Sequence, residues 1–361
     1  MTTPTPTTTP TTTSTPSTTP PETGAPTRGG RLGGIVRSLL GQNSIWILLA
    51  FILIAVVFSV LDPRAFPTQF NWTNIAINAS ILLILATGQT FVIATSGIDL
   101  SVGSVLVFSS VVATKTMVEL GERAGDPSSL GAILVGLAAG LLAGLAWGVL
   151  NGALVAVAKV PPLIVTLGSM GMAMGFAQII TGGNDVRGVP IDLITTVGSG
   201  RLFDTIPYLV LIALAVALLA GYVLNRTRFG RFTLAIGSDE EASRRNGLPV
   251  RRHIIKVYGL AGLLAGLAGF LSVARFGATT INGHATANLD TIAAVVLGGT
   301  SLFGGLASVF GTTVGVFIPT VLKNGFTIIG VQPFWQNVAV GAVLIAAVYY
   351  DQQRRRSRSH R

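Results

Sequence analysis

Apolar segments long enough to cross a bilayer recur along most of this 361-residue chain. A bilayer core about 30 Å thick needs about 20 mainly apolar residues per helix, and backbone polar groups in lipid must be satisfied within the segment. Half of the residues are hydrophobic and only 11% are charged, which is not typical of a soluble domain. The sequence therefore predicts an all-α polytopic integral membrane bundle of about ten transmembrane helices. The predicted segments are 45–61, 75–95, 98–114, 130–157, 163–181, 206–224, 255–275, 291–307, 309–322 and 335–350.

Basic residues gather at the ends of the apolar segments: before residue 41, in the loop 225–256 and after residue 353. Cytoplasmic loops of membrane proteins are enriched in Lys and Arg, so we expect these three regions, and with them both termini, in the cytoplasm. Six and then four predicted helices separate the regions, which agrees with this orientation. The net charge of +10 is then a consequence of topology, and we expect no nucleic acid partner.

The chain is expected to divide into three parts. Residues 1–40 are a Thr/Pro-rich stretch followed by a basic flank, a composition that cannot bury enough apolar surface to become ordered, so we expect a disordered cytoplasmic tail. Residues 41–351 are the predicted transmembrane domain, with a cytoplasmic loop at 225–254. Residues 352–361 are expected to be a second basic cytoplasmic tail.

The residue types argue against an enzyme and against a metalloprotein. There is no cysteine, and only three histidines are scattered along the chain, so neither a disulfide nor a metal site is expected. No set of nucleophile, base and orienting group is evident, so no catalytic residue is predicted. A membrane enzyme is therefore disfavoured.

Glycine occurs 44 times, often at every fourth position, as at Gly140, Gly144 and Gly148 or at Gly262 and Gly266. Small residues at this spacing let helices approach closely in lipid, so we interpret these glycines as packing positions.

A weak internal repeat is also present. SGIDLSVGSVLVF (96–108) resembles GGTSLFGGLASVF (298–310), and LNGAL (150–154) resembles KNGFT (323–327). The two offsets differ, 202 residues against 173, so one half carries roughly 29 additional residues between its motifs. Gly-interrupted apolar segments in two related halves are typical of transport pathways.

Asp99 lies between two apolar runs, where an ionised carboxylate costs at least about 2.5–3.5 kcal/mol. Gly97 permits a break there, and Asp99, assisted by Ser101, is predicted to cap a new helix that starts near Leu100. Capping and lining of a solute path are compatible roles, and both remain open.

Several uncharged polar residues accompany Asp99 in the apolar segments. For each residue, interhelical hydrogen bonding is the favoured explanation. As a set, however, a lining of uncharged donors and acceptors suits a neutral polyhydroxy solute better than an ion. The candidate pathway residues are Gln89, Thr90, Asp99, Ser101, Asn151 and Asn324.

The stretch SDEEASRRNGLPV (238–250) predicts a short helix in the cytoplasmic loop. Ser238 is its expected cap, acids fill the first turn and bases the last, and Gly247 ends it. Glu241 and Arg245 are expected to pair along one face. Besides a solvated loop, this pattern favours a docking helix for a cytoplasmic partner. Its candidate contact residues are Glu240, Glu241, Ala242, Arg244, Arg245, Gly247 and Leu248.

The chain carries no phosphate-binding loop of the form G-x-x-x-x-G-K-[ST], because each of its four lysines follows a residue other than glycine. Any ATP would have to be hydrolysed by another chain.

Four long motifs carry a resemblance to a known family. They are GQTFVIATSGIDLSVGS (88–104), NGALVAVAKVPPLIVTLGSMGMAMGFAQIITGG (151–183), TRFGRFTLAIGSDEEASRRNGLPVRR (227–252) and LDTIAAVVLGGTSLFGGLASVFGTTVG (289–315). From about residue 70 to 351 the chain resembles the permease subunits of bacterial ABC importers for monosaccharides of the ribose/xylose/galactose type.

The resemblance implies ATP-driven, binding-protein-dependent import of a neutral monosaccharide across the bacterial cytoplasmic membrane. It implies as partners cytoplasmic ATPase subunits, which bind ATP and Mg, an extracytoplasmic sugar-binding protein, and a second permease copy or a paralogue. No cofactor is implied in this chain. Glu241, Ala242 and Gly247 match the coupling-helix pattern of the family, whereas Asn288 stands where an acid is usual.

Other solutes and another energy source are the alternatives. A branched-chain amino acid or a nucleoside would fit the same architecture. An ion-coupled secondary transporter normally shows paired ionisable residues in the membrane, and we expect Asp99 and Asp290 to lack a membrane-embedded Lys, Arg or His partner.

Overall fold

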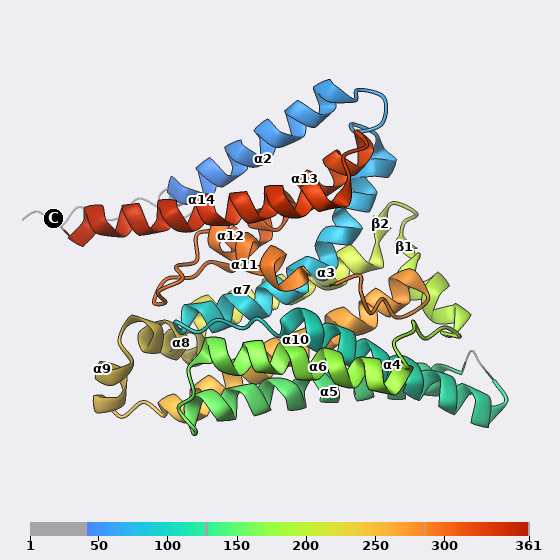
Figure 1. Cartoon of the computed structure of the whole chain (residues 1–361), viewed down its shortest axis with the longest axis horizontal. Helices are drawn as coiled ribbons and strands as arrows, with labels where there is room; N and C mark the ends of the chain where they lie inside the picture. The colour runs from blue at the N-terminus through green and yellow to red at the C-terminus, as the bar shows by residue number, and fades with distance from the viewer. Residues whose placement is uncertain (1–41, 127–128, 285, 360–361) are drawn as a thin grey trace, which may run out of the picture. The chain divides into compact units, whose positions relative to one another are not determined.

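A computed structural model describes residues 42–126, 129–284 and 286–359. The chain divides into two units, Met1–Leu39 and Leu40–Arg361, and every described residue belongs to the second, shown in Figure 1. The predicted tail of residues 1–40 lies outside the described residues. The helices are α2 (Gln42–Leu61), α3 (Gln69–Ala94), α4 (Val102–Ala124), α5 (Leu130–Ala156), α6 (Pro162–Thr181), α7 (Tyr208–Arg226), α8 (Arg228–Ser238), α9 (Glu240–Arg245), α10 (Val250–Phe276), α11 (Ala287–Leu297), α12 (Val309–Gly315), α13 (Phe317–Ile328) and α14 (Pro333–Ser359).

The all-α polytopic bundle is confirmed. Each predicted apolar segment coincides with one or more helices, and α3, α4, α5, α6, α7 and α10 are long and apolar enough to cross a membrane. A π-helix, η1 (Leu193–Gly198), and two paired two-residue strands, β1 (Arg201–Leu202) and β2 (Ile206–Pro207), lie between α6 and α7. The chain is therefore a multi-pass membrane protein.

Three predicted segments differ from the structure. The segment 291–307 is not one helix, because α11 ends at Leu297 and a glycine-rich loop, residues 298–308, follows it. The segment 309–322 extends to Ile328 and is divided into α12 and α13, and α14 continues into the predicted basic tail, to Ser359. Positive φ angles at Gly299, Gly304 and Gly305 explain the first difference, because a helix cannot accommodate them.

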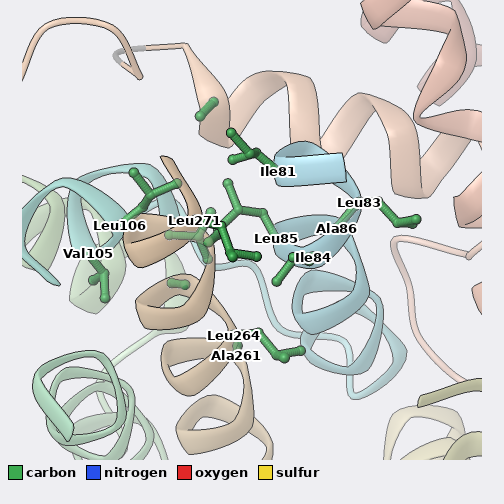
Figure 2. Packing of buried hydrophobic residues seen from close by; sticks show 14 of the residues in the cluster. Ile81, Leu83, Ile84, Leu85, Ala86, Val105, Leu106, Ala261, Leu264 and Leu271 are labelled. Atoms are coloured by element: carbon green, nitrogen blue, oxygen red, sulfur yellow. The ribbon is translucent and has the colours of Figure 1, made fainter. Parts of the chain in front are cut away.

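Helices α3 and α10 form the centre of the bundle. In each, 83% of the most apolar stretch is buried, against 22% in α5. Figure 2 shows Ile81, Leu85 and their neighbours on α3 facing Leu106 on α4 and Leu264 and Leu271 on α10. The outer helices instead expose large apolar residues, as a surface facing lipid requires; examples are Leu142, Leu163, Ile179 and Leu218.

Backbone contact between α5 and α10 holds this centre together. A Cβ atom added at Gly144 would lie 2.3 Å from the carbonyl oxygen of Gly262, and one added at Gly148 would lie 2.2 Å from that of Tyr258. Carbon and oxygen atoms cannot approach so closely without overlap, so side chains larger than hydrogen are excluded here. The interpretation of these glycines as packing positions is confirmed.

The helix termini meet at two ends. At the first, which we call the α9 end, residues 95–101 lie against α8 and the 298–308 loop, and α9 lies beside the start of α10 (Figure 1). At the second, called the opposite end, Val186 of the α6–α7 connection donates to Thr279 after α10. Arg123 and Glu119 near the end of α4 pair there on the surface.

The internal repeat holds for one motif pair only. Residues 96–108 and 298–310 each contain a break between two helices, α3 and α4 or α11 and α12, and the two breaks contact one another. The Asn-Gly motifs, however, lie on α5 in one half and on α13 in the other. The helix between the break and the Asn-Gly motif is α4, with 23 residues, in the first half and α12, with 7 residues, in the second, which accounts for part of the roughly 29 additional residues.

We predict that Gly148→Ala destabilises the purified protein by about 1–3 kcal/mol, because the methyl group would overlap α10 and force the helices apart. Gly171→Ala on α6 is the matched control, since no atom lies within 4 Å of its added Cβ. Alanine favours helix over glycine, so the control should melt at the same or a higher temperature. Equal melting temperatures for both variants in detergent would contradict close α5–α10 contact.

Candidate functional site

Asp99 is almost fully buried in the break between α3 and α4. Its Oδ1 atom accepts hydrogen bonds from the Ser101 backbone amide at 2.8 Å and from the Ser101 hydroxyl at 2.6 Å. The predicted cap is wrong in register, because α4 begins at Val102 and its N-cap is Ser101. Asp99 therefore stabilises the turn that leads into α4 rather than the first turn of the helix.

The turn at Asp99 is held by two further helices. Asn151 of α5 donates from Nδ2 to the Ser101 hydroxyl at 2.9 Å, and the Thr166 hydroxyl of α6 donates to the Ile98 carbonyl at 3.2 Å. Asp99, Ser101 and Asn151 thus form the one group of predicted pathway residues that the structure brings into contact. The group lies at the α9 end, not halfway along the bundle.

Ser96 joins three segments that are far apart in the sequence. Its hydroxyl lies 3.0 Å from the carbonyl oxygen of Gly237 on α8 and 2.7 Å from that of Phe303 in the 298–308 loop. Gly305 of the same loop donates to the Ala94 carbonyl at the end of α3. We call these contacts the Ser96 junction. Gly97 was expected to permit the break. The residue with positive φ there is Ser96 (62°), and Gly97 leaves room for the Tyr258 hydroxyl.

The other predicted pathway residues lie apart from Asp99. Thr90 of α3 hydrogen-bonds to Thr312 of α12 at 2.9 Å, as the interhelical alternative predicts. Gln89 is fully buried, and neither atom of its amide has a hydrogen-bond partner among the described residues. Asn324 faces a separate cavity that lies along the middle of α3.

This cavity has a volume of about 360 Å³, within the range of small-molecule sites. It is enclosed by α3, α11, α13 and the segment that connects α10 to α11. Its lining combines polar groups with apolar ones. The lining residues are Asn78, Ile81, Leu82, Leu85, Phe276, Gly283, His284, Thr286, Ala287, Asp290, Pro319, Thr320, Lys323, Asn324 and Thr327.

An ion pair crosses the cavity wall. Lys323 Nζ of α13 lies 2.5 Å from Asp290 Oδ2 of α11 and donates to the Thr286 hydroxyl at 3.2 Å. The expectation that Asp290 lacks a basic partner is therefore wrong. Sequence analysis missed the pair because 33 residues separate its members. Each is nevertheless an ionisable residue in an apolar segment, which by itself marks a functional candidate.

Helix α9 is short and exposed, and its charged side chains pair with one another. The Asp239 carboxylate accepts from the Ala242 amide at 2.8 Å, so the cap is Asp239 and not Ser238, which ends α8. The predicted Glu241–Arg245 pair is confirmed at 3.1 Å, and Glu240 pairs with Arg244. Such exposed pairs contribute little to stability.

Two more predicted contact residues flank α9. Gly247 has a φ of 79° and ends the helix as predicted, and no atom lies within 4 Å of a Cβ added there. Leu248 is half-buried against the main core. Ala242 is exposed. The predicted contact residues therefore lie on an exposed surface at the α9 end, and Leu248 packs beside them against the core.

A second hollow lies beside α9. It is lined by residues of the α3–α4 break, by the α5–α6 connection with Lys159, and by Glu240 and Arg244 of α9. The α9 surface is thus continuous with the segment that contains the Ser96 junction. Within the described ranges, no group of three His, Asp or Glu residues could hold a metal ion.

Comparison with known proteins assigns a family. Residues 71–348 match the family described as "Branched-chain amino acid transport system / permease component". The chain belongs to this family. It is 39% identical to the ribose import permease protein of Escherichia coli (strain K12), over 88% of this chain and 95% of that protein.

Further relatives carry other sugar names. The chain is 35% identical to the fructose import permease protein of Rhizobium meliloti, over 84% of each chain. It is 34% identical to the galactose/methyl galactoside import permease protein of Haemophilus influenzae, over 87% of this chain and 94% of that protein. No solved structure matches the chain. The family description names amino acids, whereas these relatives' names refer to sugars.

We predict that Asp99→Asn retains partial transport, because an amide oxygen can still accept from the Ser101 amide and hydroxyl. Asp99→Leu should lose transport, since it leaves the Ser101 amide unsatisfied in a buried turn. Solute uptake should be measured alongside membrane abundance and melting temperature. Normal folding and equal uptake in both variants would show that Asp99 neither supports the turn nor acts in the pathway.

Proposed function

We propose that this chain is the transmembrane permease subunit of an ATP-driven, binding-protein-dependent importer that moves a neutral monosaccharide across the bacterial cytoplasmic membrane. The observation that carries the proposal is helix α9, an exposed and internally paired helix joined through α8 to the Ser96 junction. A helix that is fully paired within itself and contributes little to the core is suited to contact with a partner.

The partners follow from what this chain lacks and from what its relatives are named. The sequence contains no phosphate-binding loop, so we propose that separate ATPase subunits bind ATP and Mg and dock on α9. In the same scheme, a sugar-binding protein delivers solute at the opposite end, and a second copy or a paralogue completes the permease. The chain itself needs no cofactor for this role.

The orientation rests on charge. The α9 end carries the bases of the 225–256 loop, including Arg226, Arg231 and Arg251, and positive loops remain on the cytoplasmic side. We therefore place the α9 end in the cytoplasm and the cavity toward the outside. The exposed apolar residues of the outer helices then face lipid, within a transmembrane domain of residues 41–351 and with a coupling loop at 225–254.

A neutral sugar is favoured over an amino acid by the relatives' names and by the cavity. The amide of Asn324 and the hydroxyls of Thr286 and Thr327 line it, and such groups match sugar hydroxyls. An ion-coupled mechanism gains one argument from the Asp290–Lys323 pair, but the family assignment outweighs it.

We predict that Ala242→Trp leaves the permease inserted and folded but separates it from its ATPase, because a bulky group on α9 holds the two surfaces apart. Thr205→Trp, in the exposed β1–β2 turn at the opposite end, is the matched control for co-purification of the ATPase, because it lies far from α9; stimulation is compared with the wild type only. Co-purification of the ATPase and its stimulation by the loaded binding protein are the measurements. Wild-type retention and stimulation in the Ala242→Trp variant would remove α9 as the docking helix. Gly247→Val adds backbone strain at a positive φ and should act in the same direction.

A further inference from the structure

The cavity beside α3, α11 and α13 has hydrogen-bonding groups in its wall that the protein leaves unused. Asp290 is 7% exposed, and its Oδ1 atom is buried without a hydrogen-bond partner in the described part of the chain. The same holds for Oδ1 of Asn324. Both residues line the cavity. Both atoms have less than 1 Å² of accessible surface, so a ligand in the cavity reaches them only after these side chains rotate. Unsatisfied buried acceptors are costly, and a ligand that donates hydrogen bonds to them favours that rotation.

The ammonium of Lys323 completes the set. It has three N–H donors, of which one is directed to Asp290 and one to Thr286. One donor therefore remains for a ligand. Phe276 and Leu82 supply apolar surface in the same cavity. Two acceptors, one donor and an apolar wall match a sugar, which has hydroxyl groups at its rim and C–H groups on its ring faces.

The charges of the cavity cancel. Among the described lining residues, Asp290 and Lys323 are the only Asp, Glu, Lys or Arg, and they neutralise one another at 2.5 Å. A charged solute would lose its hydration on entering and would meet no free countercharge, which is expensive in a partly buried site. A neutral solute of the same shape does not carry this cost.

We propose that the Asp290–Lys323 pair makes this cavity a solute site that selects for uncharged sugars. Asp290 Oδ1, Asn324 Oδ1 and Lys323 bind hydroxyl groups, while the mutual neutralisation of the pair excludes sugars that carry a net charge. This inference rests on the proposed function and adds the residues that determine solute charge. Breaking one member of the pair should change which charge the cavity accepts, because the remaining member is left uncompensated.

Three matched pyranoses provide the test: galactose is neutral, galacturonate is an anion and galactosamine is a cation. Each is added to the purified full-length permease in complex with its ATPase, at equal concentration and ionic strength, and the melting temperature is recorded. A ligand that binds the folded state raises this temperature. Galactose alone should raise that of the wild type.

Asp290→Asn should be stabilised by galacturonate by about 2–4 °C, because Lys323 then lacks a countercharge. Lys323→Met should instead be stabilised by galactosamine. In the double variant, Asp290→Asn with Lys323→Met, both charges of the pair are removed, so neither charged sugar should stabilise it. Asp192→Asn removes an exposed carboxylate outside the cavity lining. Its response to the three sugars should be that of the wild type, with galactose alone raising the melting temperature.

The outcomes separate the two proposals. If the wild type does not form a complex with the ATPase, the proposed function fails. If the complex forms but the order of the three sugars is the same in wild type, Asp290→Asn and Lys323→Met, or if galactose stabilises none of them, the selective site is wrong. A shift toward galacturonate in Asp192→Asn would also overturn it, because the effect would then follow overall charge and not the cavity.

Discussion

The contact between the backbones of α5 and α10 is the constraint on which the rest of the structure depends. Gly144, Gly148 and Gly262 bring the two helices so close that carbonyl oxygens occupy the space of missing side chains. Helices in lipid gain little from hydrophobic association, so close packing of this kind is the main source of their affinity. With α10 fixed against α5, its other faces contact α3 and α4. This core positions the two segments that matter for function, α3 and α11.

Those segments, α3 and α11, lead from the cavity to the α9 end. Helix α3 lines the cavity with Asn78, Ile81 and Leu85 and ends at the Ser96 junction. Helix α11 carries Asp290 in its first turn and leads into the 298–308 loop, which reaches the same junction through Phe303. Both helices therefore run from the cavity to a point that contacts α8, the helix that precedes α9. Helix α9 is therefore connected to the cavity through α8, the Ser96 junction and the helices α3 and α11.

Much of this could be predicted from the sequence, and the remainder depends on pairing across long separations. Apolar length predicts the helices, and four-residue glycine spacing predicts close packing, because both signals are local. Local chemistry also predicts the Glu241–Arg245 pair and the break before α4. The Asp290–Lys323 pair, the Ser96 junction and the separation of Asn324 from Asp99 were missed, because they depend on which segments meet. The one-residue error in the cap of α9 has a local cause, since Ser238 and Asp239 are both good capping residues.

The energy source is the central claim, because an intramembrane Asp–Lys pair is also found in carriers that use ion gradients. The most direct measurement is solute uptake into proteoliposomes that contain the permease, its ATPase and its loaded binding protein, with ATP and ion gradients controlled separately. The account predicts uptake that requires ATP on the side of α9 and that continues when ionophores abolish the proton and sodium gradients. Uptake that persists without ATP and stops with the ionophores would contradict it.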